Sequence, residues 1–369
     1  MTSTKRAKAV LYLADGTLFE GLSIGKKGTS GGEICFNTGM TGYQEIYTDP
    51  SYYGQIVINT NAHIGNYGVH KDEDESDRPK IKGLVVNDFT YDYSRSSASG
   101  SLEDYLSSHE TVGISDLDTR MLVRHVRDKG AMNAIISTEI FDIAKLQAEL
   151  KNIPDMKSLE LSSLVTTHEA YELGVDNSGF KISVLDLGVK RSILDNFLIR
   201  DCHLKVFPAK TRFGEMRAWD ADGYFISNGP GDPEVMDYAV DTIKEILAAK
   251  KPLFGICLGN QLLARSVGIS TFKMHHGHRG LNQPVKNLIT GKSEITSQNH
   301  GFSVDMESLK NSTLAELTHI NLNDESVEGL RLTNGRAFSV QHHPESTPGP
   351  HDSTYLFDDF IQLIKNNKT

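Results

Sequence analysis

The sequence contains few cysteines and arranges none of them as a pair. Its 369 residues include three cysteines, Cys35, Cys202 and Cys257, which lie far apart and form no CxxC motif. This spacing argues against a disulfide framework or a cysteine-based zinc site, and it is typical of a protein from a reducing compartment.

Long hydrophobic runs and a surplus of basic charge are also missing. No run approaches the roughly 20 apolar residues needed to cross a bilayer, and the first residues build no secretory segment. The formal net charge of −10 disfavours nucleic acid and anionic membranes as partners, because both require a concentrated basic surface. We therefore expect a soluble, cytoplasmic protein.

Internal repeats and low-complexity segments are absent from the sequence, but its composition and hydrophobic periodicity change once along the chain. Residues 160–180 lose periodicity and gather Ser, Thr, Asn and Gly, so we expect a linker there, between domains at 1–175 and 176–369. The first domain is predicted to mix strands with loops and helices. It begins with a hairpin over 9–25 around Asp15-Gly16.

Other segments of the first domain have simpler patterns. Residues 101–113 and 118–133 are predicted to contain helices, and the second ends at Gly130. The charged stretch 71–80 reads as a solvated loop that buries nothing, although a metal or partner role stays open for it.

After residue 180 the pattern is that of an α/β protein. Short apolar runs at 181–188, 203–209, 221–227 and 252–256 alternate with helical segments, which predicts β-α units and a parallel sheet covered on both faces. Ligand sites in such sheets lie beyond the carboxyl ends of the strands. The residues that follow those runs are therefore candidates for a ligand site.

Cys257 stands at such a strand end, in the stretch PLFGICLGNQLL. A tight strand–helix turn would place its side chain at the rim of the sheet, and the small residues Gly255 and Gly259 would permit the turn. The free N–H groups at the start of the helix would favour a thiolate. The pattern indicates a nucleophile, but a buried cysteine that only fills the core is an equal competitor. Cys35 and Cys202 have no comparable setting.

A thiol nucleophile needs a base and a group that orients the base. An apolar run at 337–341 leads to His343, which is followed by Pro344 and Glu345. Residues two apart in extended chain point the same way, so Glu345 can hold one imidazole nitrogen while the other faces sulfur. His342 points the opposite way and is expected to be structural or solvent-facing.

Two further segments carry candidate chemistry. The strand end SNGPGDP (227–233) lets backbone N–H groups approach a ligand and suits an oxyanion, although an ordinary turn or a phosphate loop has the same composition. The histidines of MHHGHRG (274–280) suggest a metal, but no carboxylate or cysteine stands at ligand spacing, so we expect a Gly-rich loop and no metal.

Together, SNGPGDP, GICLGNQLL, SQNHGF (297–302) and HPE resemble the class I, triad-type glutamine amidotransferases. KMHHGHRGLNQPV and the first half of the chain, with GEICFNTGMTGYQEIYTDPSYYGQIV, HIGNYG and GISDLDTRMLVRHVRDKGAMNAII, more narrowly resemble the small subunits of carbamoyl phosphate synthetase. The resemblance spans almost the whole chain. It implies a flavodoxin-like C-terminal domain behind a mixed β/β/α domain.

The resemblance also implies an activity and its residues. The chain would hydrolyse L-glutamine to glutamate and ammonia through a γ-glutamyl thioester, and pass ammonia to a large synthetase subunit. That subunit would use ATP, Mg and bicarbonate to make carbamoyl phosphate for arginine and pyrimidine synthesis, whereas this subunit would need no cofactor. Cys257 would be the nucleophile, His343 the base and later the acid, and Glu345 the orienting group. The residues implied to surround glutamine and its oxyanion are Ser51, Gly229, Gly231, Leu258, Gln261, Asn299, Gly301 and Phe302.

One position departs from the family pattern. Relatives commonly have His where this chain has Asn260, and Asn hydrogen-bonds but does not titrate. We expect tuned activity, since that histidine is not a triad member. Two other readings remain open: a stand-alone peptidase or γ-glutamyl hydrolase, and a regulatory scaffold that binds glutamine without turnover.

Overall fold

The computed structural model describes residues 6–368, and the chain divides between Met156 and Lys157 into two compact units. The sequence placed this boundary later, at 175/176. The difference arises because the intervening segment hydrogen-bonds to the second unit: the backbone N–H of Ser158 donates to Asp232 Oδ2 over 2.7 Å. Polar composition alone did not reveal that a loop of this kind belongs to the domain it precedes.

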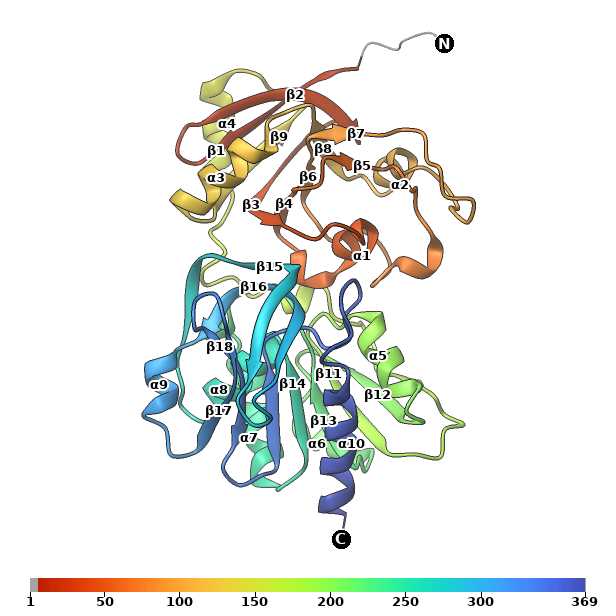
Figure 1. Ribbon diagram of the computed structural model, residues 1–369, viewed down its shortest axis with the longest axis vertical. Helices are drawn as coiled ribbons and strands as arrows, with labels where there is room; N and C mark the ends of the chain where they lie inside the picture. The colour runs from red at the N-terminus through yellow and green to blue at the C-terminus, as the bar shows by residue number, and fades with distance from the viewer. Residues whose placement is uncertain (1–5, 369) are drawn as a thin grey trace. The chain divides into compact units, whose positions relative to one another are not determined.

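The first unit is built around a closed barrel with the strand order β1-β2-β8-β6-β4-β3-β9 (Figure 1). Its strands are β1 (Lys8–Leu13), β2 (Leu18–Gly25), β3 (Thr29–Asn37), β4 (Gln55–Asn59), β6 (Gly83–Val85), β8 (Val112–Ser115) and β9 (Met132–Ser137). β1 and β2 pair antiparallel, which confirms the predicted hairpin. Aliphatic side chains such as Leu11, Ile34, Ile56 and Ile136 fill the barrel without exposure.

Short helices and a small ribbon surround the barrel. They are α1 (Tyr43–Thr48), η1 (Pro50–Tyr52), β5 (His63–Ile64), η2 (Lys71–Glu73), β7 (Asp88–Phe89), α2 (Leu102–Ser108), α3 (Thr119–Lys129) and α4 (Ile143–Leu150). The Ser101 side chain caps α2 and the Asp118 side chain caps α3, each by accepting a backbone N–H of the first turn. α3 ends at Gly130 (φ 94°), as predicted.

The prediction that the charged segment 71–80 buries nothing was wrong. Glu75 is only 3% exposed. Asp74 accepts hydrogen bonds from Gln44 Nε2 over 2.7 Å and from the Tyr105 hydroxyl over 2.6 Å. Charge composition predicts solvation only where no partner is available, and here polar side chains of α1 and α2 donate to the Asp74 carboxylate.

The second unit contains a 10-stranded sheet. Five neighbouring strands, in the order β12-β11-β13-β14-β19, run parallel. In chain order this is the 2-1-3-4-5 arrangement of a flavodoxin-like sheet. These strands are β11 (Lys181–Asp186), β12 (His203–Pro208), β13 (Gly223–Ile226), β14 (Leu253–Ile256) and β19 (Ala337–Val340). The predicted parallel fold is therefore confirmed at the centre of the sheet.

Antiparallel strands extend the sheet at both edges. β10 (Tyr171–Leu173) pairs with β12 inside the segment predicted as a linker. On the other side follow β18 (Val327–Leu332), β17 (Ala315–Asn321), β15 (Thr271–Asn287) and β16 (Ser293–Val304). The prediction of a loop at 274–280 was wrong, because this segment lies within β15, where His278 pairs with His300.

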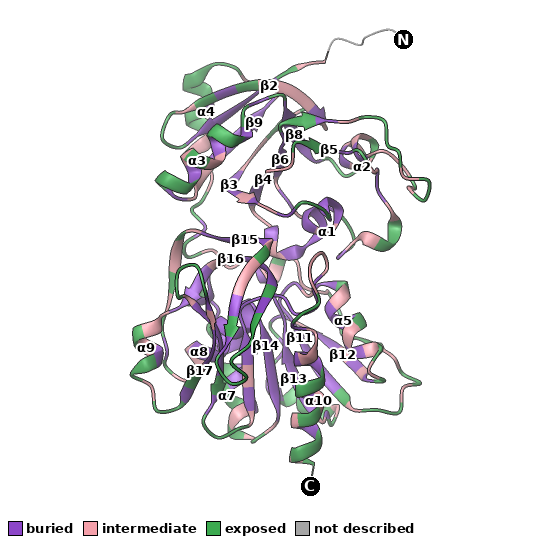
Figure 2. Ribbon diagram, viewed as in Figure 1, coloured by how far each residue is buried: buried purple, intermediate pink, exposed green. Residues whose placement is uncertain are grey.

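Helices cover both faces of this sheet, as Figure 1 shows for α5 and α10 on one face. They are α5 (Arg191–Leu198), α6 (Phe213–Ala218), α7 (Asp237–Ala248), α8 (Leu258–Ser266), α9 (Met306–Lys310) and α10 (Tyr355–Asn367), with short turns η3 (Ser162–Leu164) and η4 (Pro233–Val235). One core joins the sheet to α7 and α8, and a second joins it to α5 and α10. Figure 2 shows β13 and β14, in the middle of the sheet, buried along their whole length.

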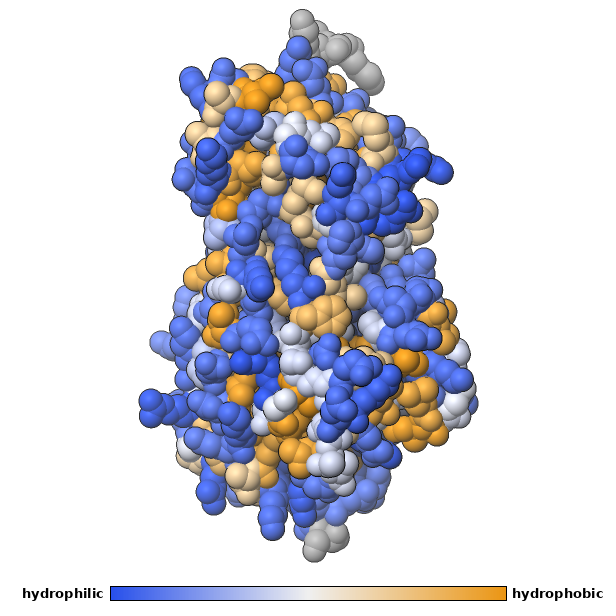
Figure 3. Space-filling view, turned by 90° about the vertical axis from the view of Figure 1, so that its left-hand side faces the viewer, coloured by the Kyte–Doolittle hydropathy of each residue, from blue (hydrophilic) through white to orange (hydrophobic). Residues whose placement is uncertain are grey.

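In the part of the chain that the structure describes, no helix combines the length and apolarity required to cross a membrane. On the face drawn in Figure 3, hydrophobic side chains reach the surface in small groups between hydrophilic ones. Groups of this kind are normal on folded proteins and require no special explanation.

Candidate active site

Cys257 occupies a strained turn between β14 and α8. Its backbone has φ 55° and ψ −102°, a conformation that residues other than glycine rarely adopt. A Cβ on Gly255 would lie 2.7 Å from the Gly259 carbonyl oxygen, and one on Gly259 would lie 2.3 Å from the Ile226 carbonyl oxygen. The two glycines therefore permit the tight turn, as the sequence predicted.

Polar atoms surround the Cys257 sulfur. The thiol donates to the Asn299 carbonyl oxygen over 3.5 Å, and the Gln341 side-chain amide donates to Sγ over 3.6 Å. The residue is 3% exposed, so the sulfur is less open than a position at the rim of the sheet would suggest. Its hydrogen-bonded setting differs from that of an inert cysteine that fills a core.

His343 and Glu345 form a buried pair that a lysine completes. His343 Nδ1 lies 2.7 Å from Glu345 Oε1, so the predicted contact between these side chains is confirmed. The same oxygen accepts a hydrogen bond from Lys190 Nζ over 2.8 Å. Lys190 also donates to the Thr347 carbonyl oxygen over 2.5 Å. All three charged side chains are at most 5% exposed.

The electrostatics of this group follow from its geometry. Burial lowers the pKa of His343, but the charges and hydrogen bonds of Glu345 and Cys257 outweigh it and raise the pKa to about 10. Burial raises the pKa of Glu345, but Lys190 and His343 outweigh it and lower the pKa to about 2. Since Glu345 holds Nδ1, Nε2 is the ring nitrogen left for proton transfer with Cys257.

The predicted oxyanion donors lie on segments built for close approach. Leu258 is the first residue of α8, where backbone N–H groups have no intrahelical carbonyl partner. Gly229 admits no side chain, because a Cβ there would lie 2.1 Å from the Leu187 carbonyl oxygen. Gly231 has φ 105°, which also favours glycine. Their role in holding an oxyanion remains a prediction.

Several of the residues predicted to surround glutamine come from α8 and β16. Asn299, Gly301 and Phe302 lie on β16. Asn299 contacts the nucleophile through its carbonyl oxygen, and the Phe302 carbonyl oxygen accepts Gln261 Nε2 over 2.9 Å. The structure thus brings Gln261 and Asn299 to the surroundings of Cys257, while glutamine binding itself stays a prediction.

Ser51 belongs to the first unit and lies in η1. Its backbone N–H donates to Asp49 Oδ1 over 2.8 Å, which holds the turn that presents this serine. Its contact with glutamine remains a prediction.

The other candidates from the sequence have structural roles. Cys35 and Cys202 are buried, and burial raises the pKa of Cys202 to about 12. His342 is fully buried, with Nδ1 at 3.7 Å from Glu328 Oε2, and so points away from the catalytic pair into a separate polar network. It is therefore structural and not solvent-facing.

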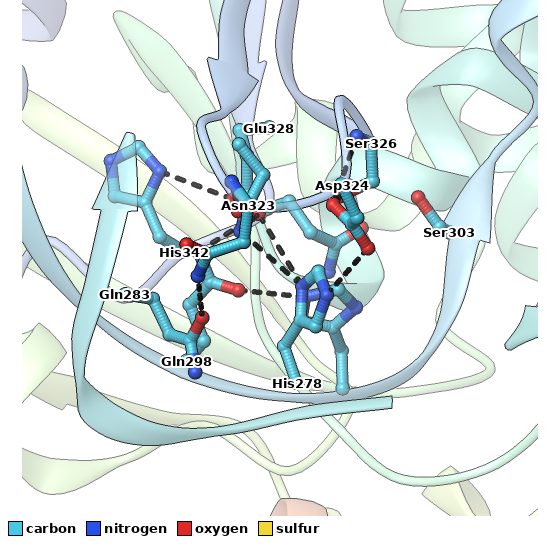
Figure 4. A network of polar contacts seen from close by, with 12 residues as sticks. His278, Gln283, Gln298, Ser303, Asn323, Asp324, Ser326, Glu328 and His342 are labelled. Atoms are coloured by element: carbon cyan, nitrogen blue, oxygen red, sulfur yellow. Dashed lines mark hydrogen bonds and ion pairs between the residues drawn. The ribbon is translucent and has the colours of Figure 1, made fainter. Parts of the chain in front are cut away.

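That network connects β15, β16 and β18 (Figure 4). Glu328 Oε1 accepts hydrogen bonds from Gln298 Nε2 over 2.8 Å and from Asn321 Nδ2 over 3.0 Å. His278 Nε2 lies 2.8 Å from Asp324 Oδ2 and its Nδ1 3.7 Å from Glu328 Oε1. Burial lowers the pKa of His278, but Asp324 and Glu328 outweigh it and raise the pKa to about 9.

The composition of this network raises again the metal site that the histidines of 274–280 suggested in the sequence. Ligand atoms of His278, His300 and Glu328 lie within 4.8 Å of one another, so the fold supplies the carboxylate that was missing near 274–280. Amide N–H groups of Gln298 and Asn321 already occupy the Glu328 oxygen that faces His278. We therefore describe a hydrogen-bonded network, and the absence of a bound metal stays a prediction.

Sequence reasoning missed Lys190 and Gln341. Lys190 follows the apolar run of β11 at a carboxyl strand end, so its position carried a signal, although one lysine among many is not distinctive. Gln341 adjoins β19 two residues before His343, and alternation along the extended chain could have placed it on the same face.

Comparisons with known proteins agree with this geometry. Residues 11–136 match the family model described as carbamoyl-phosphate synthase small chain, CPSase domain, and residues 183–363 match glutamine amidotransferase class-I. Similar curated proteins are each named carbamoyl phosphate synthase small chain. The one from Synechocystis is 47% identical over 98% of this chain and 97% of its own length. The one from Chlorobaculum tepidum is 46% identical over 98% of this chain and 98% of its own length. The one from Pasteurella multocida is 47% identical over 97% of this chain and 95% of its own length.

Proposed function

Since the chain belongs to the family of carbamoyl phosphate synthase small chains, we propose that it is the glutaminase subunit of such a synthetase. It hydrolyses L-glutamine to glutamate and ammonia, and the ammonia is used for carbamoyl phosphate synthesis. One observation carries the proposal. The second unit contains both the strained turn at Cys257, between β14 and α8, and the buried pair of His343 and Glu345.

The reaction uses this chain's own groups. Cys257 transfers its proton to His343, and the thiolate attacks the side-chain amide carbon of glutamine. Backbone N–H groups of Leu258 and of Gly229 or Gly231 stabilise the oxyanion, each contributing about 3 kcal/mol. His343 protonates the leaving nitrogen, and ammonia departs from the γ-glutamyl thioester. Water then attacks the thioester while His343 accepts its proton, which releases glutamate and restores the cysteine.

Glu345 and Lys190 prepare the imidazole for these proton transfers. Glu345 accepts from His343 Nδ1 and thereby leaves Nε2 for the reaction. A histidine held by a carboxylate is stabilised when it becomes protonated. Lys190 keeps that carboxylate ionised at the pH of the cell.

The proposal extends to a partner and a compartment. The relatives' designation as small chains supports a larger synthetase subunit as the acceptor of ammonia. ATP, Mg and bicarbonate would bind that larger subunit, so this chain would carry no cofactor. The product would serve arginine and pyrimidine synthesis in the cytoplasm.

Glutamine hydrolysis by the purified chain, with and without the large subunit, tests the proposal. We expect glutamate release that the large subunit strongly stimulates, together with carbamoyl phosphate formation in the complex. Equal activity of the isolated chain would instead identify a stand-alone hydrolase. No activity in either case would identify a scaffold.

A further inference from the structure

Gln341 lies against the nucleophile and has no assigned part in the reaction. It directly follows β19, is fully buried, and places Nε2 at 3.6 Å from Cys257 Sγ. An amide that meets a sulfur can present either its N–H or its oxygen, and only the N–H would stabilise a thiolate. The orientation of this amide therefore decides its effect.

Neighbouring groups determine that orientation. A backbone carbonyl can only accept, so Gln261 must present its Nε2 to the Phe302 carbonyl oxygen, 2.9 Å away. The same Nε2 lies 3.1 Å from Gln341 Oε1. Gln341 must therefore present its oxygen to Gln261, and its remaining group, the N–H, faces Cys257.

Asn260 supports the same arrangement from a second side. Its Nδ2 donates to Gln341 Oε1 over 3.2 Å, and its Oδ1 accepts from the Ser339 hydroxyl over 2.9 Å. Two N–H donors thus converge on one oxygen of Gln341. Reversing the Gln341 amide would bring its N–H group against both donors and lose both hydrogen bonds.

The effect of each hydrogen-bond partner on the sulfur changes when the thiol loses its proton. The Asn299 carbonyl oxygen accepts the thiol proton at 3.5 Å, so this contact favours the neutral thiol. Once the proton leaves, a carbonyl oxygen repels the thiolate, whereas the Gln341 N–H attracts it. Hydrogen bonds to charged groups are about twice as strong as neutral ones.

We propose that Gln341 is a further catalytic residue, which donates its side-chain N–H to the Cys257 thiolate as this attacks glutamine. Asn260 and Gln261 are positioning residues that hold the Gln341 amide in the donating orientation. The catalytic part of this inference rests on the proposed glutaminase function. It also assigns a use to Asn260, the position at which this chain departs from the common family pattern.

The test measures the reactivity of Cys257 in the full-length chain, without any need for turnover. Iodoacetamide alkylation of the peptide that carries Cys257 is followed by mass spectrometry between about pH 5 and pH 10. Gln341→Met keeps the length of the side chain and removes the donor. We expect alkylation at neutral pH to slow by about 10- to 100-fold, the factor that a hydrogen bond to a charged group supplies. The pH of half-maximal alkylation should rise.

A second variant guards against a failure to fold. Gln341→Glu keeps the shape and lets one oxygen accept from Asn260 and Gln261, but the other oxygen then faces the sulfur and opposes the thiolate. It should also slow alkylation at neutral pH. Thr242→Val removes another buried polar group, on α7, whose hydroxyl donates to Thr211 and Tyr238 backbone oxygens. This control should alkylate Cys257 as the wild type does.

The outcomes separate the inference from the proposed function. A wild-type alkylation profile in either folded Gln341 variant overturns the inference, even if the chain hydrolyses glutamine. Slowed alkylation supports the contact with sulfur, and in the complex kcat for glutamine should then fall by a similar factor with little change in KM. If alkylation is slowed in the Gln341 variants but the wild type never hydrolyses glutamine, the proposed function is overturned and the contact between Gln341 and the sulfur still stands.

Discussion

Lys190 Nζ and His343 Nδ1 meet the same oxygen of Glu345, at 2.8 Å and 2.7 Å. Lys190 follows β11 and His343 follows β19, so two strand ends far apart in the chain fix one carboxylate. A carboxylate held in this way keeps its charge and its direction. The imidazole that depends on it is thereby prepared for proton transfer.

Removing the lysine should impair the reaction without removing a triad member. Lys190→Met deprives Glu345 of its charged partner, which should raise the pKa of this carboxyl and loosen its hold on His343. Loss of such a supporting group typically costs about 10- to 100-fold in activity. Steady-state glutamine hydrolysis in the complex should show this as a fall in kcat.

The matched control for this variant is Lys244→Met, which alters an exposed lysine paired with Asp241 on α7. It should leave kcat unchanged. Equal kcat values for Lys190→Met and the wild type would contradict the role of Lys190.

The catalytic pair should give stability a defined pH dependence. The folded pKa of His343 is raised to about 10, so its contribution is complete below its ordinary pKa of 6.5 and declines as the pH rises toward 10. The folded pKa of Glu345 is lowered to about 2, so its contribution is complete above 4.5 and declines as the pH falls toward 2. Both contributions to stability are therefore complete between pH 4.5 and pH 6.5.

Thermal denaturation of wild type and His343→Gln checks this dependence. The difference in Tm should be greatest at about pH 5.5, which lies inside that pH window, and smaller at about pH 9.5, which lies above it. A difference that grows toward alkaline pH would have the wrong sign and would contradict the account.

The elbow glycines should tolerate no side chain. In Gly259→Ala the new Cβ would lie 2.3 Å from the Ile226 carbonyl oxygen, so the backbone at Cys257 must shift. A displacement of about 1 Å costs about 100-fold in rate, and we expect at least that loss of glutamine hydrolysis together with a lower Tm.

Gly214→Ala supplies the control for this prediction. Gly214 lies in α6 with nothing within 4 Å of its Cβ position, so alanine there should preserve activity and stabilise by about 0.5–1 kcal/mol. An active, stable Gly259→Ala protein would show that the turn is not as tight as described.

The polar network around Glu328 should matter mainly for stability. Glu328 is fully buried and helps to raise the pKa of His278, so Glu328→Gln leaves this buried, protonated histidine without one of its two compensating charges. Breaking a buried charge pair costs about 3–5 kcal/mol. Urea denaturation should show the loss, whereas Glu316→Gln, at an exposed pair with Arg331, should cost at most about 1 kcal/mol. Equal stabilities for the two variants would contradict this assignment.

Local patterns predicted the parts of this fold that local forces determine. The alternation of strands and helices after residue 180, the hairpin at 9–25 and the end of α3 at Gly130 all appeared as expected. The contact between His343 and Glu345 also followed from strand geometry. These features depend on periodicity, glycine conformation and spacing within a few residues.

Features that depend on distant partners could not be read in this way. Segment 274–280 became part of a strand because β16 pairs with it, and Glu75 is buried in a segment where Asp74 accepts hydrogen bonds from side chains of α1 and α2. Lys190 joins Glu345 across 155 residues of sequence. The antiparallel edges of the sheet likewise arise from pairing that a single sequence does not display.

The most direct test of the central claim is to trap the covalent intermediate. The complex is mixed with L-glutamine, quenched in acid within the first turnover, and digested for peptide mapping by mass spectrometry. We expect a γ-glutamyl group on the peptide that carries Cys257, and none in Cys257→Ser. Glutamate formation with no adduct at Cys257, or with the adduct on Cys35 or Cys202, would contradict this expectation.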